Sequence, residues 1–238
     1  MRLFYAEQIV SNQAILSQEE TKHCVKILRK KLGDKILIID GKGGFFEGEL
    51  IEVQKKNAII KLGQALENQQ KWDFQLHVAI APTKSIDRFE FFLEKATELG
   101  VNTITPILCK RSERKHIRLD RLNKIIVSAA KQSVKPLFPA LNPLIKLNNF
   151  LDSTSAKNAQ KFIAYCEDRP PKELAECYQA NKDVYMLIGP EGDFHPEELE
   201  QAQRFGFEPV SLGKSRLRTE TAGMVATHTI HLVNSLAT

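Results

Sequence analysis

The chain has 238 residues, of which 42% are hydrophobic and 26% are charged, and its formal net charge is +5. These values are near the averages of soluble globular proteins, so they exclude an intrinsically disordered chain. No apolar run reaches the roughly 20 residues that a membrane-spanning helix needs, and the first residues, Met1 to Gln8, contain no apolar signal segment. We therefore expect a cytoplasmic protein with no membrane partner.

The cysteines and histidines show no spacing that is typical of a metal site, so we expect no metal ion. Cytoplasmic cysteines are usually reduced, and we expect these thiols to act as small buried apolar residues. They are Cys24, Cys109, Cys166 and Cys177.

Residues 1–70 predict a small β-rich domain. Apolar spacing between Glu19 and Lys31 indicates a helix, and apolar runs at 35–40, 45–53 and 57–62 indicate strands. The glycine-rich segment 41–44 predicts a turn, because glycine adopts φ angles that strain other residues. Short strands joined by such turns are typical of a small barrel. The polar, aperiodic residues 63–72 are interpreted as a linker.

Residues 73–238 predict an α/β domain. Strands alternate with helices along this segment, which predicts a mainly parallel sheet, and the pattern alone suggests an open doubly wound one. A helix also opens at Pro196, whereas residues 142–149 are rich in turn formers. The expected strands are 74–81, 103–108, 161–165, 184–188 and 209–212, and the other expected helices are 86–99, 119–133, 172–179 and 219–236.

A basic segment runs from Lys110 to Lys135, with nine basic residues against two acidic ones. An ordinary solvated helix face is the simpler interpretation of such lysines and arginines. The local density nevertheless exceeds what solubility requires, so we favour a nucleic acid partner.

Two loops that follow predicted strands carry the strongest functional signal. Strand 184–188 ends at the segment 189–192, which has two glycines and a proline, and strand 209–212 leads into Gly213 and a polar segment with two arginines. Such loops meet at the carboxyl edge of an α/β sheet, where ligands bind. The dinucleotide fingerprint and the phosphate loop are both missing. Open backbone groups between apolar side chains instead suit a flat adenine.

These loops resemble the cofactor motifs of the SPOUT class of RNA methyltransferases, and within it those of the RsmE family. The matching motifs are Leu187-Ile188-Gly189-Pro190-Glu191-Gly192 and Leu212-Gly213 followed by Leu217-Arg218-Thr219-Glu220-Thr221-Ala222. A third match, Glu98-Leu99-Gly100-Val101 with Ile104-Thr105-Pro106, lies upstream. The resemblance covers nearly the whole chain. Many members carry glycine at Asp193 and serine or threonine at His195, and imidazole is a poorer helix cap.

The resemblance implies methylation of N3 of a uridine in 16S ribosomal RNA with S-adenosyl-L-methionine as cofactor. It implies a PUA-like RNA-binding barrel in residues 1–70. It also implies a trefoil-knotted SPOUT domain in residues 73–238 that forms a homodimer through the last helix. It further implies 16S rRNA or the small ribosomal subunit as the partner. The expected cofactor-binding residues are Leu187, Ile188, Gly189, Pro190, Glu191, Gly192, Leu212, Gly213, Leu217, Arg218 and Thr219.

Methylation of uridine N3 first requires loss of its proton, which leaves negative charge on the flanking carbonyl oxygens. Cations aimed at that charge lower the barrier, so Arg218, Arg114 and Arg29 are candidates for charge stabilisation or substrate binding. Glu191 and Glu220 are candidates for the general base by position only. The expected RNA contacts are Lys22, Lys26, Arg29, Lys30, Arg111, Arg114 and Lys115.

Three other interpretations stay open. The chain is then a SPOUT methyltransferase for a different rRNA or tRNA nucleotide, a catalytically inactive RNA-binding module, or a small-molecule α/β enzyme with an incidental basic segment. The intact second loop argues against the inactive module. Cofactor binding together with RNA-dependent methyl transfer distinguishes these cases.

Overall fold

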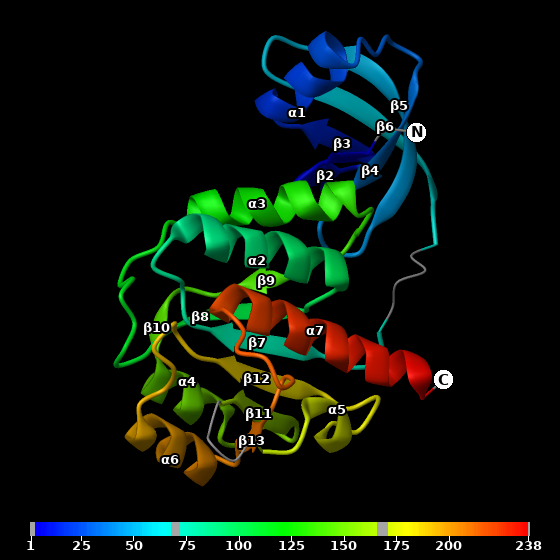
Figure 1. Ribbon diagram of the computed structural model, residues 1–238. Helices are drawn as coiled ribbons and strands as arrows, with labels where there is room; N and C mark the ends of the chain where they lie inside the picture. Colours follow the sequence, from blue (N-terminus) through cyan, green and yellow to red (C-terminus); the bar gives the residue numbers. More distant parts are fainter. Residues whose placement is uncertain (1–2, 68–71, 166–170, 238) are drawn as a thin grey trace. The chain divides into compact units, whose positions relative to one another are not determined.

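The computed structural model describes residues 3–67, 72–165 and 171–237 (Figure 1). The chain divides into two compact units. The first unit comprises residues 1–71 together with 126–138, and the second comprises residues 72–125 together with 139–238. The helix α3 (Leu119–Gln132) therefore contributes its second half to the first unit.

The first unit is built on a six-stranded, mainly antiparallel sheet in the order β1-β4-β5-β6-β3-β2. Its edge strands β1 and β2 are not paired with each other in the part of the chain that the structure describes. Phe4, Ile38, Leu50 and Ile60 are fully buried in its core. The strands are β1 (Leu3–Tyr5), β2 (Gln8–Val10), β3 (Gln13–Leu16), β4 (Lys35–Ile39), β5 (Phe45–Val53) and β6 (Ala58–Ala65).

The sequence predictions hold for the central hairpin of this unit and fail at its ends. Gly41 and Gly43 have φ angles of 73° and 102°, so the predicted turn between β4 and β5 is confirmed. The linker prediction for residues 63–72 is wrong at its start, because β6 continues to Ala65, and residues 68–71 lie outside the described ranges.

The predicted helix 19–31 is shorter than expected. The α-helix α1 (Gln18–Lys22) is followed by a π-helix, His23–Ile27. A π turn is wider than an α turn, so residues in this segment do not follow the 3.6-residue spacing from which the helix was predicted. Ile27 is 63% exposed.

The second unit contains a seven-stranded sheet in the order β10-β8-β7-β12-β11-β13, with β9 also paired to β8. All of its strand pairs are parallel, which confirms the prediction of a mainly parallel sheet. The strand β12, the first half of the main sequence motif, lies between β7 and β11. The strands are β7 (Leu76–Ile80), β8 (Thr103–Leu108), β9 (Ala140–Leu141), β10 (Ile145–Lys146), β11 (Gln160–Ala164), β12 (Val184–Ile188) and β13 (Glu208–Val210).

Helices cover both faces of this sheet (Figure 1). One face packs against α2 (Ile86–Leu99), α5 (Leu174–Cys177) and α7 (Thr219–Leu236), and the other against α4 (Leu147–Thr154) and α6 (Pro196–Arg204). Gly100, with a φ angle of 111°, ends α2 as predicted. The turn-rich prediction for residues 142–149 is wrong from Leu147 onward, where α4 begins.

The strand order brings the carboxyl ends of β11, β12 and β13 to one edge of the sheet. The segments that follow β12 and β13 are the two loops of the sequence motif. The fold thus confirms the α/β class. In the described ranges, no helix is long and apolar enough to cross a membrane.

Candidate functional site

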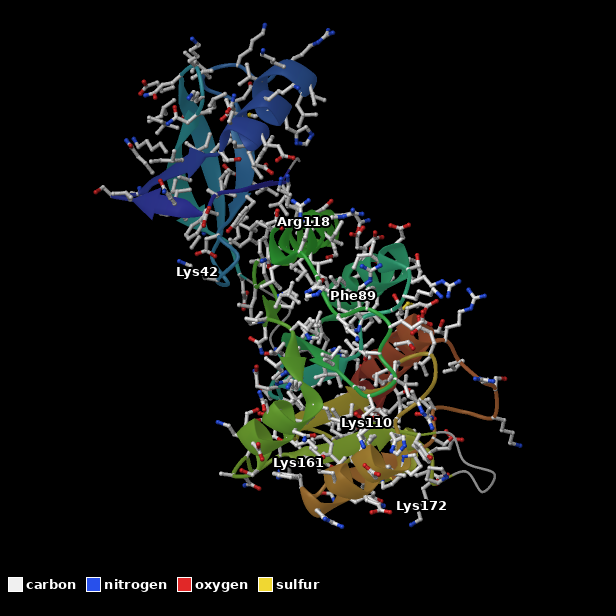
Figure 2. All side chains as sticks on the ribbon, turned by 90° about the vertical axis from the view of Figure 1, so that its left-hand side faces the viewer. Lys42, Phe89, Lys110, Arg118, Lys161 and Lys172 are labelled. Atoms are coloured by element: carbon white, nitrogen blue, oxygen red, sulfur yellow. The ribbon has the colours of Figure 1, made fainter. Side chains whose placement is uncertain are left out.

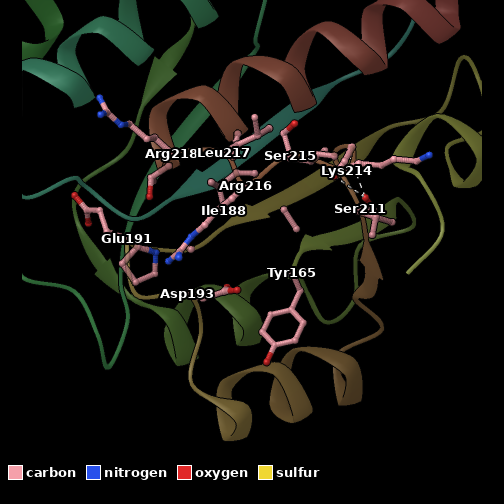
Figure 3. Close-up of a pocket in the computed structure, with 18 of the residues that line it drawn as sticks. Tyr165, Ile188, Glu191, Asp193, Ser211, Lys214, Ser215, Arg216, Leu217 and Arg218 are labelled. Atoms are coloured by element: carbon pink, nitrogen blue, oxygen red, sulfur yellow. Dashed lines mark hydrogen bonds between the residues drawn. The ribbon is translucent and has the colours of Figure 1, made fainter. Parts of the chain in front are cut away.

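A cavity of about 960 Å³ opens at this edge of the second unit (Figure 3). Its walls are residues 188–191 and 193 after β12, residues 210–219 after β13, and Ala164 and Tyr165 at the end of β11. Arg88 at the start of α2 and Ala222 on α7 complete it. The two motif loops, separated by some twenty residues in sequence, therefore share one cavity.

Most of the expected cofactor residues line this cavity. Leu187 does not, because side chains alternate along a strand; it is fully buried in the core on the α4 and α6 face. Gly192 is also absent from the wall, and its Cα faces the side chain of Arg111. The predicted residues on the wall are Ile188, Gly189, Pro190, Glu191, Leu212, Gly213, Leu217, Arg218 and Thr219.

The glycines of the two loops serve different purposes. A Cβ on Gly189 would lie 3.0 Å from Cδ2 and 3.3 Å from the backbone N of Phe194, a fully buried residue. Gly189 is thus needed for packing within its own loop. Gly213 has a φ angle of 111° and no heavy atom within 4 Å of a Cβ position, so the second loop is open to the cavity.

Asp193, one of the two departures from the family motif, occupies a position that favours glycine. Its φ angle is 62°, in the left-handed region, which aspartate tolerates better than most residues. Its Oδ1 accepts a hydrogen bond of 2.7 Å from Phe194 N. Asp193 lines the cavity, and its side chain is bonded to the backbone of its own loop.

The first motif loop is held from outside by the segment that follows β8. Arg111 Nη1 donates to the carbonyl oxygens of Gly192 at 2.7 Å and Phe194 at 3.3 Å. Figure 2 labels Lys110, whose ammonium pairs with Glu197. The buried Glu198 accepts hydrogen bonds from Lys110 N at 2.8 Å and His195 N at 2.9 Å.

His195, the second departure, does cap α6. Its Nδ1 accepts a hydrogen bond of 3.4 Å from Glu197 N, and together with Glu198 it forms a capping box. The imidazole thus takes the place of the usual hydroxyl, although the contact is long.

The three arginines proposed for catalysis are not brought together. Arg218 lines the cavity. Arg114 does not, since its Nε and Nη2 donate to the carbonyl oxygens of Thr83 at 2.9 Å and Lys84 at 2.5 Å, between β7 and α2. Arg29 is exposed in the first unit, with a φ angle of 53°.

The two acids named as possible bases also differ in position. Glu191 lines the cavity, but its Oε1 already accepts a hydrogen bond of 2.8 Å from Lys84 N. Glu220 is buried in the first turn of α7, away from the cavity wall, and its Oε2 has no hydrogen-bond partner among the described residues.

Most charges of the basic segment 110–135 are engaged within their own unit. Besides Lys110, Arg111 and Arg114, Arg118 pairs with Asp120, Arg121 with Glu90, and Lys131 with Glu20, while Lys135 is buried. Lys115 and Lys124 are exposed with no partner among the residues described. In the first unit, Lys22, Lys26 and Arg29 are exposed, and Lys30 donates to Lys35 O at 3.3 Å.

Several wall residues were not predicted. Ala164 and Tyr165 end a correctly predicted strand, but the sequence does not tell which strands are neighbours. Arg88 is far from the motifs in sequence, and Lys214, Ser215 and Arg216 lie within the second loop, between predicted positions. Their place after Gly213 was the one available signal.

The family model described as RNA methyltransferase domain matches residues 70–231, and the one described as RNA methyltransferase PUA domain matches residues 16–63. RNA methyltransferases are thus the class that this sheet and its carboxyl-edge cavity define.

Individual relatives narrow that class. Ribosomal RNA small subunit methyltransferase E of Mesomycoplasma hyopneumoniae is 31% identical over 94% of this chain and 96% of its own. A probable rRNA-methyltransferase from Porphyromonas gingivalis has a TM-score of 0.92 and 39% identity over 100% of both chains. The ribosomal RNA small subunit methyltransferase E from Neisseria gonorrhoeae bound to S-adenosyl methionine has a TM-score of 0.87 and 28% identity over 98% of both. The chain belongs to the ribosomal RNA small subunit methyltransferase E family.

Proposed function

We propose that the chain methylates N3 of a uridine in the 16S rRNA of the small ribosomal subunit, in the cytoplasm, with S-adenosyl-L-methionine as the methyl donor. The observation that carries this proposal is the convergence of both motif loops on one cavity. The structure of the Neisseria gonorrhoeae relative, titled as bound to S-adenosyl methionine, supports the cofactor.

The residues of the cavity suit this cofactor. Ile188, Leu212 and Leu217 are apolar wall residues that can enclose an adenine, while the loop backbone can bind its edge. Glu191 and Asp193 add two carboxylates to the wall. The cofactor is a net cation and supplies an electrophilic methyl group on its sulfonium, so acidic wall residues favour its binding.

The chemical task of the chain is to align uridine N3 and to favour its deprotonated form. Alignment in a closed site can supply a large part of the barrier reduction. Arg218 on the cavity wall can stabilise negative charge on the uracil oxygens. Arg114 instead has a positioning role: its guanidinium fixes the Thr83–Lys84 backbone, whose Lys84 N in turn donates to Glu191.

RNA binding is assigned to both units. In the first unit the exposed cations Lys22, Lys26 and Arg29 support contacts to phosphates. In the second unit, Lys115 and Lys124 are exposed cations of segment 110–135 that have no partner among the described residues. Arg111 and Arg114 remain in the proposed surface, but their guanidinium groups already bind backbone carbonyls.

We also propose a homodimer formed through α7. Val225, Thr229, Leu232 and Leu236 follow one another at helical spacing. Leu232 is 46% exposed and Leu236 is 78% exposed. Ala226, on the same helix, is fully buried in the core of its own unit. A second copy would cover the exposed stripe.

The test is labelled methyl transfer from S-adenosyl-L-methionine to small-subunit rRNA. The full chain should label the RNA, and Arg218→Ala should lower the single-turnover rate by roughly 100-fold or more, as removal of a charge-stabilising donor does elsewhere. Arg204→Ala removes the same charge from the exposed surface of α6 and should leave the rate unchanged. No labelling by the full chain would refute the proposal.

A further inference from the structure

We propose that Arg88 and Arg216 bind backbone phosphates of the RNA at the cavity, beside the nucleotide that is methylated. This inference rests on the proposed function. It adds Arg88 and Arg216, two residues on the cavity wall, to the proposed RNA-binding surface.

The basic side chains on the cavity wall are available to bind a ligand. Four basic side chains line the cavity, and all four are exposed: Arg88, Lys214, Arg216 and Arg218. Among the described residues, none of their side chains has a hydrogen bond or an ion pair. Figure 3 shows Arg216 extending across the cavity toward the loop of Glu191, whereas Lys214 extends away from it.

The charges on the cavity wall favour an anionic ligand in addition to the cofactor. The cofactor is itself a net cation, so the two carboxylates of Glu191 and Asp193 suit it, whereas four basic side chains oppose it. These basic side chains do not suit the cationic cofactor, so they favour a second ligand that is anionic. An RNA phosphate is that ligand, and a guanidinium can donate to two of its oxygens at once.

The cavity is large enough for a second ligand beside the cofactor. Pockets for small ligands usually measure about 300–1,000 Å³, so a volume of about 960 Å³ is at the upper end. It leaves room for a nucleotide next to the cofactor. The phosphates flanking a base that enters the cavity must then lie at its rim, within reach of long arginine side chains.

The backbone at Arg88 is fixed, although its side chain has no partner among the described residues. Arg88 lies in the first turn of α2, where Arg88 N donates to Ser85 O at 3.2 Å. The preceding Thr83 and Lys84 are fixed by Arg114 and Glu191. Arg114 thus organises the backbone that carries Arg88, so the arginine that binds the backbone and the arginines without a protein partner have distinct tasks.

The experiment measures the affinity of the full chain for a small-subunit rRNA transcript as a function of salt concentration. Each neutralised phosphate releases counterions, so Arg88→Ala and Arg216→Ala should each lower the slope of log K against log[salt] by about 0.7 to 0.9. Arg88→Lys and Arg216→Lys should restore the slope, because the charge is kept, but only part of the affinity. Arg204→Ala is the charge-matched control and should leave the slope unchanged.

Cofactor affinity, measured by calorimetry without RNA, separates the outcomes. The inference requires that S-adenosyl-L-methionine binds both alanine variants about as tightly as the unaltered chain. Weaker cofactor binding with an unchanged salt slope would show that the arginines contact the cofactor, and would overturn the inference. An unchanged slope together with unchanged cofactor affinity would overturn it as well. Methyl transfer by the unaltered chain would still stand in either case, so the proposed function is tested separately.

Discussion

His77 is a partly buried ionisable residue whose titration should be visible in the stability of the protein. It lies on β7, where its Nε2 is 2.7 Å from Thr105 Oγ1, and that oxygen also accepts from Asn142 Nδ2 at 2.7 Å. The rings of Phe150 and Tyr185 pack against it. Burial lowers the pKa of His77 from 6.5 to about 4, because a charged imidazole would lose its hydration there.

The pKa shift of His77 predicts loss of stability in acid. The unfolded chain binds a proton at His77 below pH 6.5, whereas the folded chain does so only below about pH 4. The free energy of unfolding should therefore be highest above pH 6.5 and fall between pH 6.5 and 4, by about 3 kcal/mol from this residue. Urea denaturation across this range measures the effect. His77→Gln should remove most of this pH dependence, and an equal dependence in the variant would contradict the assignment.

At the level of elements, the loop after β12 should lose its shape when its internal packing against Phe194 is altered. In Gly189→Ala the new Cβ would press on Phe194, which is fully buried. We expect the loop to shift and the cofactor affinity to fall roughly tenfold, or about 1.4 kcal/mol. Gly192→Ala is the matched control, since its Cβ would meet only Arg111 atoms at 3.4 and 3.5 Å. Calorimetry that shows equal cofactor affinity for both variants would contradict this role of Gly189.

Local sequence signals predicted the bounds of those elements that are followed or preceded by a distinctive residue, such as glycine. The helix α2 has the predicted bounds, because Gly100 supplies the left-handed residue that ends it. The strand β12 and the helix α7 also have their predicted bounds. The motif loops follow directly from these elements, which is why most of the predicted cofactor positions lie on one cavity.

What the sequence did not reveal depends on contacts between distant residues. Strand order is one example, since no local feature tells that β11 lies between β12 and β13. The partners of Arg111 and Arg114 are another, because a guanidinium that binds backbone carbonyls reads in sequence like one that is free for RNA. The helix α4 was missed although Leu147, Phe150 and Leu151 have helical spacing. A knotted path was available only through the family resemblance, since such paths are rare.

At the scale of the whole molecule, we propose two domains, residues 1–70 and 73–238, with the refinement that the second contributes residues 126–138 to the first compact unit. Within that unit Lys131 pairs with Glu20 at 2.5 Å, and the ring centroids of Phe138 and Tyr5 are 4.9 Å apart. These contacts are lost when the chain is cut at the linker. The seven-stranded sheet and the cavity lie wholly within residues 73–238.

A fragment of residues 73–238 should therefore fold, dimerise and bind S-adenosyl-L-methionine. Its free energy of unfolding should be lower than that of the same unit in the full chain, because residues 126–138 lose their partners. It should methylate rRNA poorly, since the RNA contacts of the first unit are absent and alignment is lost. Light scattering, calorimetry and methyl transfer assays measure the three properties. Methyl transfer at the rate of the full chain would contradict the role of the first unit in recognition.

The most direct test of the central claim is mass mapping of the modified nucleotide. Small-subunit rRNA is incubated with the full chain and S-adenosyl-L-methionine, digested with nucleases, and compared with RNA from a reaction with Arg218→Ala. The account predicts one uridine that gains a single methyl group on its base at N3, with little or none in the variant. A methyl group on the ribose or on another nucleotide, or an unmodified RNA, would contradict it.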